Sequence, residues 1–394
     1  MFLRQLGRSK AIAAASLGLA CGMAASSPAS YSKDSLTTKR WHFYKGKMHP
    51  NIGNTVKLFK CDDTPIADEI AEYLGIKLSD MSVSRFADGE TSIQVNENVR
   101  GQRVYIVSST ITVDRIMELL LSIAAMRRAS AKTIVAVIPF YGYARQDMVS
   151  KGRGPISAAD LARMLEEMGV DHVVTVDLHS SQIEGFFKPE VPVDNLNAAP
   201  VGSVFFSEQN IKHPCVVAPH ASAVRRSLLF RDTLQRTYDT PLPMAIVVKK
   251  HILDRSTPGE LVGDVEGKDC IVVDNLVDTG TSWCRMMMRD GRDDRVALGS
   301  TMIEVAKLLK SHGAATVSAF CVHGRFSSNA IDALNECKEL DLIVTTDTIP
   351  CPSNVEAQKT SKIVTLSVAP FLAEAISCIH AKGSMSQKFA LSAS

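Results

Sequence analysis

The sequence lacks the short motifs that mark several common kinds of site. Its nine cysteines form no C-x-x-C pair and H-E-x-x-H is absent, so a structural zinc site is not expected. The odd cysteine count without regular spacing is typical of free thiols in a reducing compartment, not of a disulfide framework. The absence of G-x-x-x-x-G-K-S/T argues against a P-loop NTPase.

An excess of one charge sign is also missing. The 44 Lys and Arg residues balance 42 Asp and Glu residues, for a formal net charge of +2. This balance argues against a protein whose main task is to bind nucleic acid. Hydrophobic residues make up 45% of the 394 residues, which is enough to bury a core and argues against disorder. At about 150 residues per domain, the length favours two or three domains.

Acidic residues are absent from the first 33 positions, where four Lys or Arg residues occur among many Ala and Ser. The apolar stretch of residues 11–25 is shorter than the roughly 20 residues that span a bilayer, so no membrane span is expected. We interpret residues 1–48 as a leader, and its composition favours an organellar, mitochondrial-type transit peptide. A secretory signal and a disordered extension of a cytoplasmic protein are the alternatives.

From about residue 58 onward, short apolar runs alternate with helical patterns. Several runs are almost continuously apolar, which is typical of strands covered on both faces in a parallel sheet. The expected strands are residues 104–107, 134–140, 172–176, 216–218, 245–248, 271–273, 316–322 and 342–345. The expected helices are residues 66–74, 114–126, 157–168, 301–311 and 371–379, the third with Ser157 as its N-cap. The alternation predicts an α/β architecture, and prolines and asparagines near residue 195 indicate a boundary between two α/β domains.

Polar residues follow many of these runs. Because ligands gather at the carboxyl ends of the strands in such sheets, these residues are the first candidates for a functional site. They comprise Ser108-Ser109, Tyr143–Asp147, Asp177–His179, Pro219-His220, Lys249-Lys250 and Asp274–Gly280. A set of acids, bases and histidines at one kind of sheet edge favours phosphate chemistry with a metal ion.

The segment from Ile271 to Gly280 is an apolar strand that runs into an acidic turn. Backbone N–H groups in such a turn can bind a phosphate, while Asp274 and Asp278 can bind ribose hydroxyls or magnesium-bound water. An ordinary strand–turn–helix connection, with Asp and Thr as caps, fits the same spacing equally well.

Two further segments have both a functional and a structural interpretation. Tyr143, Arg145 and Gln146 offer an aromatic surface for a base, a guanidinium for polyphosphate and an amide for base edges. Packing of the tyrosine and a surface Arg–Asp pair is the structural alternative. His179 follows a buried strand, where it is either a metal ligand or a hydrogen-bonded structural histidine.

Eight motifs occur in order between about Val56 and Phe389. They are RFADGE at 85–90, NENVRG at 96–101, AVIPFYGYARQD at 136–147, VDLHSSQIEGFF at 176–187, PVDN at 192–195, VGDV at 262–265, TDTIP at 346–350 and LAEAI at 372–376. This set resembles the ribose-phosphate pyrophosphokinases, also called phosphoribosyl pyrophosphate synthetases.

The resemblance implies a fold of two similar type I phosphoribosyltransferase domains, each a mostly parallel sheet flanked by helices. The expected boundaries are residues 50–195 for an ATP-side domain, 196–367 for a ribose-phosphate domain, and 368–394 for a helix and tail that pack on the first domain. The implied reaction transfers the diphosphoryl group of ATP to O1 of ribose 5-phosphate for nucleotide biosynthesis.

The resemblance also implies roles for individual residues. For ATP it implies Phe86, Asp88, Glu90, Arg145, Gln146 and Asp147. For ribose 5-phosphate it implies Asp274, Asn275, Asp278, Thr279, Gly280, Thr281 and Ser282. The Mg²⁺ that bridges the ATP phosphates is expected at His179 and His220, and the catalytic lysines are Lys249 and Lys250.

Further implied partners are other subunits and small regulators. Identical subunits, or a hetero-oligomer with paralogues, would complete the nucleotide site across an interface, and phosphate would be a possible activator. Matching regulatory positions are Asn98, Arg100, Arg153, Asp194, Asn195, Ser384 and Ser386. No nucleic acid or membrane is expected as a partner.

Several departures from the family pattern concern the expected active site. His220 stands where the family has a magnesium-binding carboxylate, Asn275 replaces the second acid of an acidic pair, and Lys250-His251 replace arginines. Residues 281–299 interrupt the ribose-phosphate loop, which either Thr281-Ser282 or Gly299–Thr301 completes. A gene-model artefact at this segment is an alternative to a true insertion.

Two functions therefore stay open. A working synthetase is favoured because the ATP-side motifs are nearly intact and histidine can substitute as a metal ligand. A catalytically weak or inactive regulatory subunit that assembles with active paralogues is the alternative, supported by His220, Asn275 and the interrupted loop. A phosphoribosyltransferase would not need the ATP-side motifs.

Overall fold

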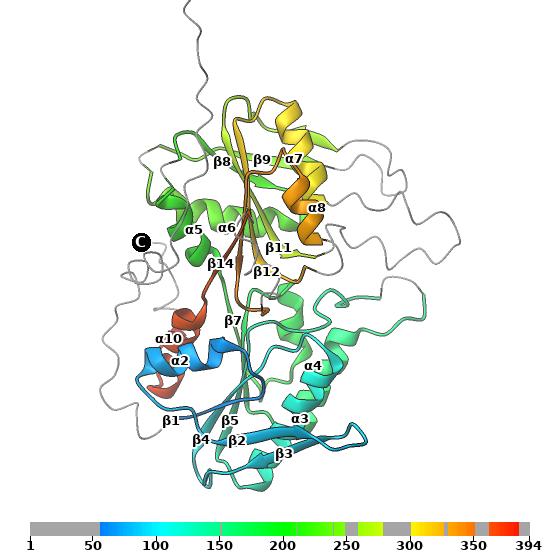
Figure 1. Cartoon of the computed structure of the whole chain (residues 1–394), viewed down its shortest axis with the longest axis vertical. Coiled ribbons are helices and arrows are strands. Elements are labelled where there is room, and N and C mark those ends of the chain that lie inside the picture. Colours follow the sequence, from blue (N-terminus) through cyan, green and yellow to red (C-terminus); the bar gives the residue numbers. More distant parts are fainter. Residues whose placement is uncertain are drawn as a thin grey trace, which may run out of the picture. The chain divides into compact units, whose positions relative to one another are not determined.

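The computed structural model describes residues 56–149, 152–209, 211–238, 240–248, 259–278, 301–326, 330–350 and 362–385 (Figure 1). All of these residues fall within one compact unit. The expected leader at residues 1–48, the residues 281–299 and the regulatory candidate Ser386 lie outside the described residues. No helix in the described ranges combines the length and the apolar character needed to cross a bilayer.

The first sheet contains five parallel strands in the order β1-β4-β5-β6-β7. The strands are β1 (Val56–Lys60), β4 (Arg103–Val107), β5 (Thr133–Ile138), β6 (His172–Val176) and β7 (Val193–Leu196). Its helices are α2 (Pro65–Leu74), α3 (Val113–Arg128), α4 (Ser157–Met168) and a 3-10 turn at Ser181–Phe186.

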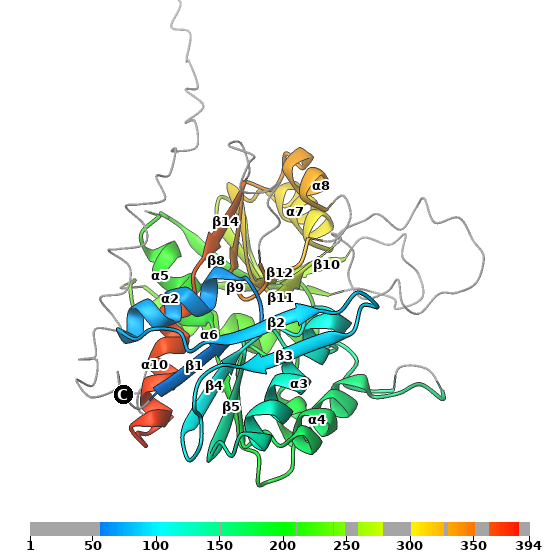
Figure 2. The ribbon, with the colours of Figure 1, turned by 60° about the horizontal axis from the view of Figure 1, so that its bottom comes forward.

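A separate antiparallel hairpin is formed by β2 (Met81–Arg85) and β3 (Thr91–Val95). It lies along α3, as Figure 2 shows, and is anchored there by Arg85, whose Nη2 lies 3.0 Å from Oδ2 of Asp114 and 3.5 Å from Oε1 of Glu118. The turn of this hairpin carries Asp88.

The second sheet contains seven strands in the order β10-β9-β8-β11-β12-β13-β14. All neighbours are parallel except β10 (Glu260–Val262), which is antiparallel to β9 (Met244–Val248). The other strands are β8 (Pro214–Ala218), β11 (Asp269–Val277), β12 (Thr316–Gly324), β13 (Leu342–Thr346) and β14 (Ile363–Leu366). The helices are α5 (Ala199–Ser207), α6 (Val224–Gln235), α7 (Thr301–Ser311), α8 (Ala330–Glu336) and α10 (Ala369–His380), with a 3-10 turn at Ala221–Ala223.

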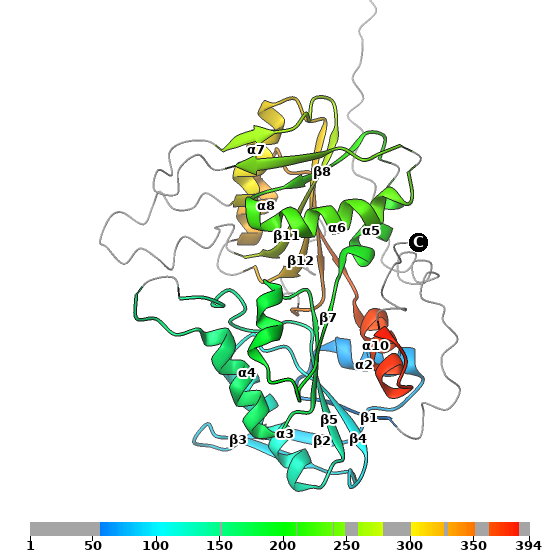
Figure 3. The same cartoon turned by 180° about the vertical axis from the view of Figure 1, so that it is seen from behind.

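Both sheets are covered on both faces. Because successive residues of a strand point to opposite faces, neighbouring residues of one strand pack in different hydrophobic clusters. In β11, Ile271 and Val273 belong to the cluster that contains α5 and α6, whereas Val272 packs with α7 and α8. Figure 3 shows α5 and α6 together on one face of this sheet. The near-continuous apolar runs of the sequence are therefore two-sided strands, and the predicted α/β fold class is confirmed.

The helix α10 contacts α2 of the first half of the chain. The guanidinium of Arg103, in β4, donates to the carbonyl oxygen of Ile379 at 3.0 Å. Phe371, Leu372 and Ile376 of α10 share one hydrophobic cluster with residues of both sheets. The last helix thus connects the two halves, while the division of the chain into separate domains at residue 195 stays a prediction.

The start of α4 differs from the prediction. The helix begins at Ser157, and its N-cap position is occupied by Ile156, whose side chain cannot cap. The Ser157 hydroxyl donates instead to Oε1 of Gln146 at 2.7 Å, so it ties the helix to the loop after β5. The prediction that Ser157 is the N-cap was therefore wrong.

Candidate functional site

A cleft of about 860 Å³ is lined by residues from both sheets. The first sheet contributes the loop after β5 and the ends of β6 and β7, and the second contributes the ends of β8 and β11 and the start of α6. The residues that line it and carry polar groups include Arg145, Asp147, Asp177, His179, Asn195, His220, Arg225, Arg226, Asp274, Asn275 and Asp278. The carboxyl ends of strands from two sheets thus meet at one site, as expected for this architecture.

The turn after β6 is held by many polar contacts. Asp177 adopts a left-handed backbone conformation with φ of 48°, which is unfavourable for a residue with a side chain. Its backbone N–H donates to the carbonyl of Leu196 at 2.8 Å, and the next N–H, of Leu178, donates to Oδ1 of Asn195 at 3.0 Å. Contacts from β7 therefore hold this turn from the first sheet.

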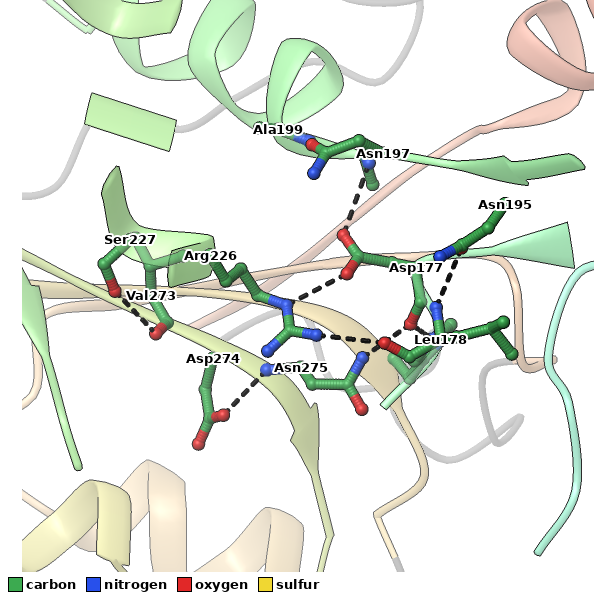
Figure 4. Close-up of polar contacts among 12 residues, drawn as sticks. Asp177, Leu178, Asn195, Asn197, Ala199, Arg226, Ser227, Val273, Asp274 and Asn275 are labelled. Atoms are coloured by element: carbon green, nitrogen blue, oxygen red, sulfur yellow. Dashed lines mark hydrogen bonds and ion pairs between the residues drawn. The ribbon is translucent and has the colours of Figure 1, made fainter. Parts of the chain in front are cut away.

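The second sheet contacts the same turn. The guanidinium of Arg226, in α6, donates through Nε to Oδ1 of Asp177 at 2.9 Å and through Nη2 to the carbonyl of Leu178 at 3.2 Å (Figure 4). The Asn275 amide, at the end of β11, donates to the Asp177 carbonyl at 2.7 Å. The turn that precedes His179 is thus fixed by side chains of both sheets.

His179 lies at the end of this turn with one ring nitrogen unpaired. Its Nδ1 is buried and has no hydrogen-bond partner in the described part of the chain. Burial lowers the pKa of His179 more than the nearby Asp147 carboxylate raises it. The neutral form of the ring is therefore favoured at pH 7.

His220 follows β8 and is engaged at both ring nitrogens. Its Nε2 lies 3.3 Å from Oδ2 of Asp274, and its Nδ1 lies 2.8 Å from the Ser222 hydroxyl. Burial alone would raise the pKa of Asp274, but His220 and the Asn275 backbone N–H hold that pKa below its ordinary value. Asp274 is therefore an ionised carboxylate in the cleft, with His220 beside it.

The loop after β5 contributes Arg145 and Asp147 to the cleft. Nη2 of Arg145 lies 3.4 Å from Oδ2 of Asp278, so this ion pair crosses from the first sheet to the second. Burial lowers the pKa of Arg145, against the raising effect of Asp278. Asp147 accepts a hydrogen bond from the Ser180 hydroxyl at 2.6 Å, which places it beside His179.

Some predicted residues lie away from this cleft. Phe86, Asp88 and Glu90 are on the β2–β3 hairpin, outside the lining of the cleft, and the Phe86 side chain is 58% exposed. The Glu90 backbone N–H donates to Oδ1 of Asp88 at 3.1 Å. The structure therefore places these three residues, which were expected to contact ATP, on the surface of their own chain.

The predicted regulatory residues are spread over several elements. Oδ1 of Asn98 accepts from the Arg100 backbone N–H at 3.1 Å, in the connection between β3 and β4. Asp194, in β7, contacts Nε2 of His172 at 2.8 Å, whereas Asn195 lines the cleft. Arg153 precedes α4 and Ser384 follows α10. Their regulatory role stays a prediction.

Seven predicted site residues lie outside the described residues. They are Lys249, Lys250, Thr279, Gly280, Thr281, Ser282 and Ser386. Arg226 is a cleft residue that sequence reasoning missed. It lies inside a helix rather than directly after a strand, so the search for polar residues at strand ends did not select it. Its partner, Asp177, lies 49 positions earlier in the chain, so the sequence held no local signal for it.

Comparisons with known proteins show the family of this chain. Residues 56–169 match the model for the N-terminal domain of ribose phosphate pyrophosphokinase, and residues 229–390 match that for the phosphoribosyl synthetase-associated domain. A ribose-phosphate pyrophosphokinase of Vibrio parahaemolyticus is 42% identical over 341 residues, which cover 85% of this chain and 99% of that protein.

The chain belongs to the ribose-phosphate pyrophosphokinase family.

A second member of this family, from Caldanaerobacter subterraneus, is 39% identical over 343 residues, covering 85% of this chain and 98% of that one. The crystal structure of the phosphoribosylpyrophosphate synthetase from Mycobacterium smegmatis matches with a TM-score of 0.71 and 33% identity, over 84% of this chain and 100% of that one. The predicted type I phosphoribosyltransferase fold is confirmed by this match.

The charge of the cleft bears on the magnesium expected for this family. Three arginines line it against five carboxylates, so a ligand rich in phosphate needs added positive charge there. Among the described residues, no three His, Cys, Asp or Glu side chains come together to hold a metal. The buried, unpaired Nδ1 of His179 is suited to be a single protein ligand of a hard cation. Phosphate and water oxygens would complete the coordination shell of that cation. His220 offers no lone pair in its present contacts.

Proposed function

We propose that this chain transfers the diphosphoryl group of ATP to O1 of ribose 5-phosphate, giving 5-phosphoribosyl 1-pyrophosphate and AMP. The observation that carries the proposal is the composition of the cleft. Arg145, Asp147 and His179, on the ATP side of the family pattern, face Asp274 and Asp278 of the ribose-phosphate side. One site can thus hold both substrates next to each other.

In this reaction O1 of the ribose attacks the β-phosphorus of ATP. The new O1–Pβ bond forms as the bond from Pβ to the bridging oxygen of AMP breaks, and the O1 proton is lost. Asp274 and Asp278 would accept hydrogen bonds from ribose hydroxyls and so orient O1. Arg145 would leave Asp278 and bind the polyphosphate. Lys249 and Lys250 would stabilise charge on the transferred group.

The metal would bind beside His179. Magnesium, when bound, neutralises the phosphate charge and polarises the reacting phosphoryl group. The neutral His179 ring, aligned by the turn that begins at Asp177, would hold it, and Asp147 would contribute its charge nearby. The remaining work of the chain is to position two substrates in a cleft where five carboxylates outnumber three arginines.

We further propose that the β2–β3 hairpin completes the site of another subunit. The exposed Phe86 ring and the hairpin carboxylates lie outside the cleft of their own chain. Co-expression of two inactive variants, Phe86→Ala with Lys249→Ala, should restore part of the activity, because a neighbour can supply the intact hairpin. Mixed oligomers with no activity would contradict a shared site.

A regulatory subunit is the second candidate function. It is favoured by the contact of His220 with Asp274, where the family pattern has a carboxylate for magnesium. Histidine is a poorer ligand than carboxylate for this hard cation. In that case the fold would serve assembly with an active paralogue.

The test is AMP and phosphoribosyl pyrophosphate formation by the purified chain with ATP, Mg²⁺, phosphate and ribose 5-phosphate. Turnover that is lost in Lys249→Ala would support the synthetase. Folded protein without turnover, which changes the rate or phosphate response of an added active paralogue, would support the regulatory subunit instead.

A further inference from the structure

Asn275 faces the turn after β6 and not the open cleft. Its side chain is only 5% exposed, and its Nδ2 donates to the Asp177 carbonyl at 2.7 Å. The nitrogen of this amide is thus used within the protein, on a residue that lies almost a hundred positions earlier in the chain.

The Asp177 backbone needs such support. Its φ of 48° lies in the left-handed region that glycine adopts most freely, and such a conformation persists where neighbours hold it. The Asp177 carbonyl accepts from two donors of the second sheet, Asn275 at 2.7 Å and Nε2 of His323 at 3.3 Å. The Asp177 carboxylate accepts from Arg226 and from the Ala198 backbone N–H.

An amide is the side chain that suits this position, because its nitrogen can donate to the Asp177 carbonyl. A carboxylate, which the family pattern has here, carries no proton to donate and would place a negative charge against that carbonyl. The turn that the amide holds leads to His179, whose buried Nδ1 is unpaired in the described part of the chain.

We propose that Asn275 is a positioning residue, which fixes the Asp177 turn and thereby the place of His179, the residue that would bind a divalent metal. This inference rests on the proposed function, since the metal is the one that would bridge the ATP phosphates. It revises the sequence-based assignment of Asn275 to ribose 5-phosphate. It also links the two sides of the cleft, because Asn275 adjoins Asp274 in β11.

The test uses Asn275→Leu in the full-length protein, with Asn335→Leu as the matched control. Asn335, in α8, also bonds a backbone group, accepting from the Lys362 N–H at 3.3 Å, but it does not line the cleft. Binding of Mn²⁺ alone is measured by electron paramagnetic resonance. Loss of such a support typically weakens metal binding about 10- to 100-fold, which is the expected result for Asn275→Leu only.

One further readout separates positioning from substrate binding. The KM for ribose 5-phosphate should stay within a factor of about two at saturating metal, while the metal concentration for half-maximal rate rises. Unchanged Mn²⁺ binding with a raised KM for ribose 5-phosphate would overturn the inference and make Asn275 a ribose ligand.

A second variant covers the case in which Asn275→Leu does not fold. His323→Phe keeps a ring against Phe140 and removes the other donor to the Asp177 carbonyl, so it should weaken Mn²⁺ binding in the same direction. A chain that binds Mn²⁺ but forms no product would contradict the synthetase and still test this inference. A wild-type chain that binds no Mn²⁺ would overturn both.

Discussion

Arg226 and Asp177 form an ion pair that joins the two sheets at the cleft. Nε of Arg226 lies 2.9 Å from Oδ1 of Asp177, and the two side chains are only 13% and 7% exposed. One residue comes from α6 and the other from the turn after β6. The pair therefore holds in place the backbone that presents His179, as Figure 4 shows for its contacts with Leu178.

Removal of one partner of this pair should destabilise the fold strongly. Arg226→Met leaves the Asp177 carboxylate buried without its cation, which typically costs about 3–5 kcal/mol. Urea unfolding followed by circular dichroism would measure the loss. Arg231→Met, in the same helix, removes an exposed pair with Asp232 and should change the free energy by less than about 1 kcal/mol. Equal effects of the two variants would show that the buried pair is not a stabilising element.

Features of the fold that have a local cause in the sequence could be predicted, whereas features without a local cause could not. The strand β11 was predicted because its apolar run is local and continuous, although its observed bounds, Asp269–Val277, are wider. The hairpin strand β2 was not predicted, because it is largely exposed and its sequence, MSVSR, has no apolar run. A short apolar segment indicates a strand that is buried on both faces of its sheet. Such segments do not indicate edge strands or exposed hairpins.

The same distinction applies to the cleft. Asp274 and His179 were found because they follow buried strands, and strand ends converge in this fold. The role of Arg226 depends on Asp177, which lies 49 positions away in the sequence, and Asn275 was interpreted from its neighbours in β11 instead of from its contacts. Such pairings require the packing of the two sheets and have no local signal.

His220→Asp should tighten the binding of magnesium. The new carboxylate would lie beside that of Asp274, so the two charges would repel each other without a cation and bind one more tightly when it is present. We expect half-maximal activity at a lower Mg²⁺ concentration and lower stability in the presence of a chelator. Ser222→Ala, which removes only the hydroxyl that contacts His220, is the control. An unchanged magnesium profile would mean that position 220 does not face the metal.

The buried His323 should make the fold sensitive to mild acid. Burial lowers the pKa of His323 to about 4, whereas a histidine in the unfolded chain titrates near 6.5. Between these values the unfolded state binds more protons, so stability falls as the pH drops from about 6.5 to 4, by up to about 3 kcal/mol. The urea midpoint of the wild type should therefore fall more steeply over this range than that of His323→Gln. His312→Gln, at an exposed histidine, is the matched control, and parallel profiles for all three proteins would contradict the effect.

Asp347 should make the fold less stable as the pH rises, which is opposite to the effect of His323. It directly follows β13 and accepts from the Val368 backbone N–H at 2.8 Å. Burial, together with the nearby charge of Glu69, raises the pKa of Asp347 to about 7. The folded state therefore binds a proton more readily than the unfolded state, so stability falls as the pH rises from about 4 to 7, by up to about 4 kcal/mol.

Asp347→Asn should remove this penalty, since an amide oxygen can still accept from Val368 without carrying charge. We expect the variant to match the wild type near pH 4 and to exceed its free energy of unfolding by pH 8, measured with urea at both values. Asp341→Asn is the control, because Asp341 is paired with Lys310 and accepts from the Val317 N–H, so its neutralisation should not stabilise the fold. A gain for Asp347→Asn that is the same at both pH values would point to packing and would contradict titration of Asp347 as its cause.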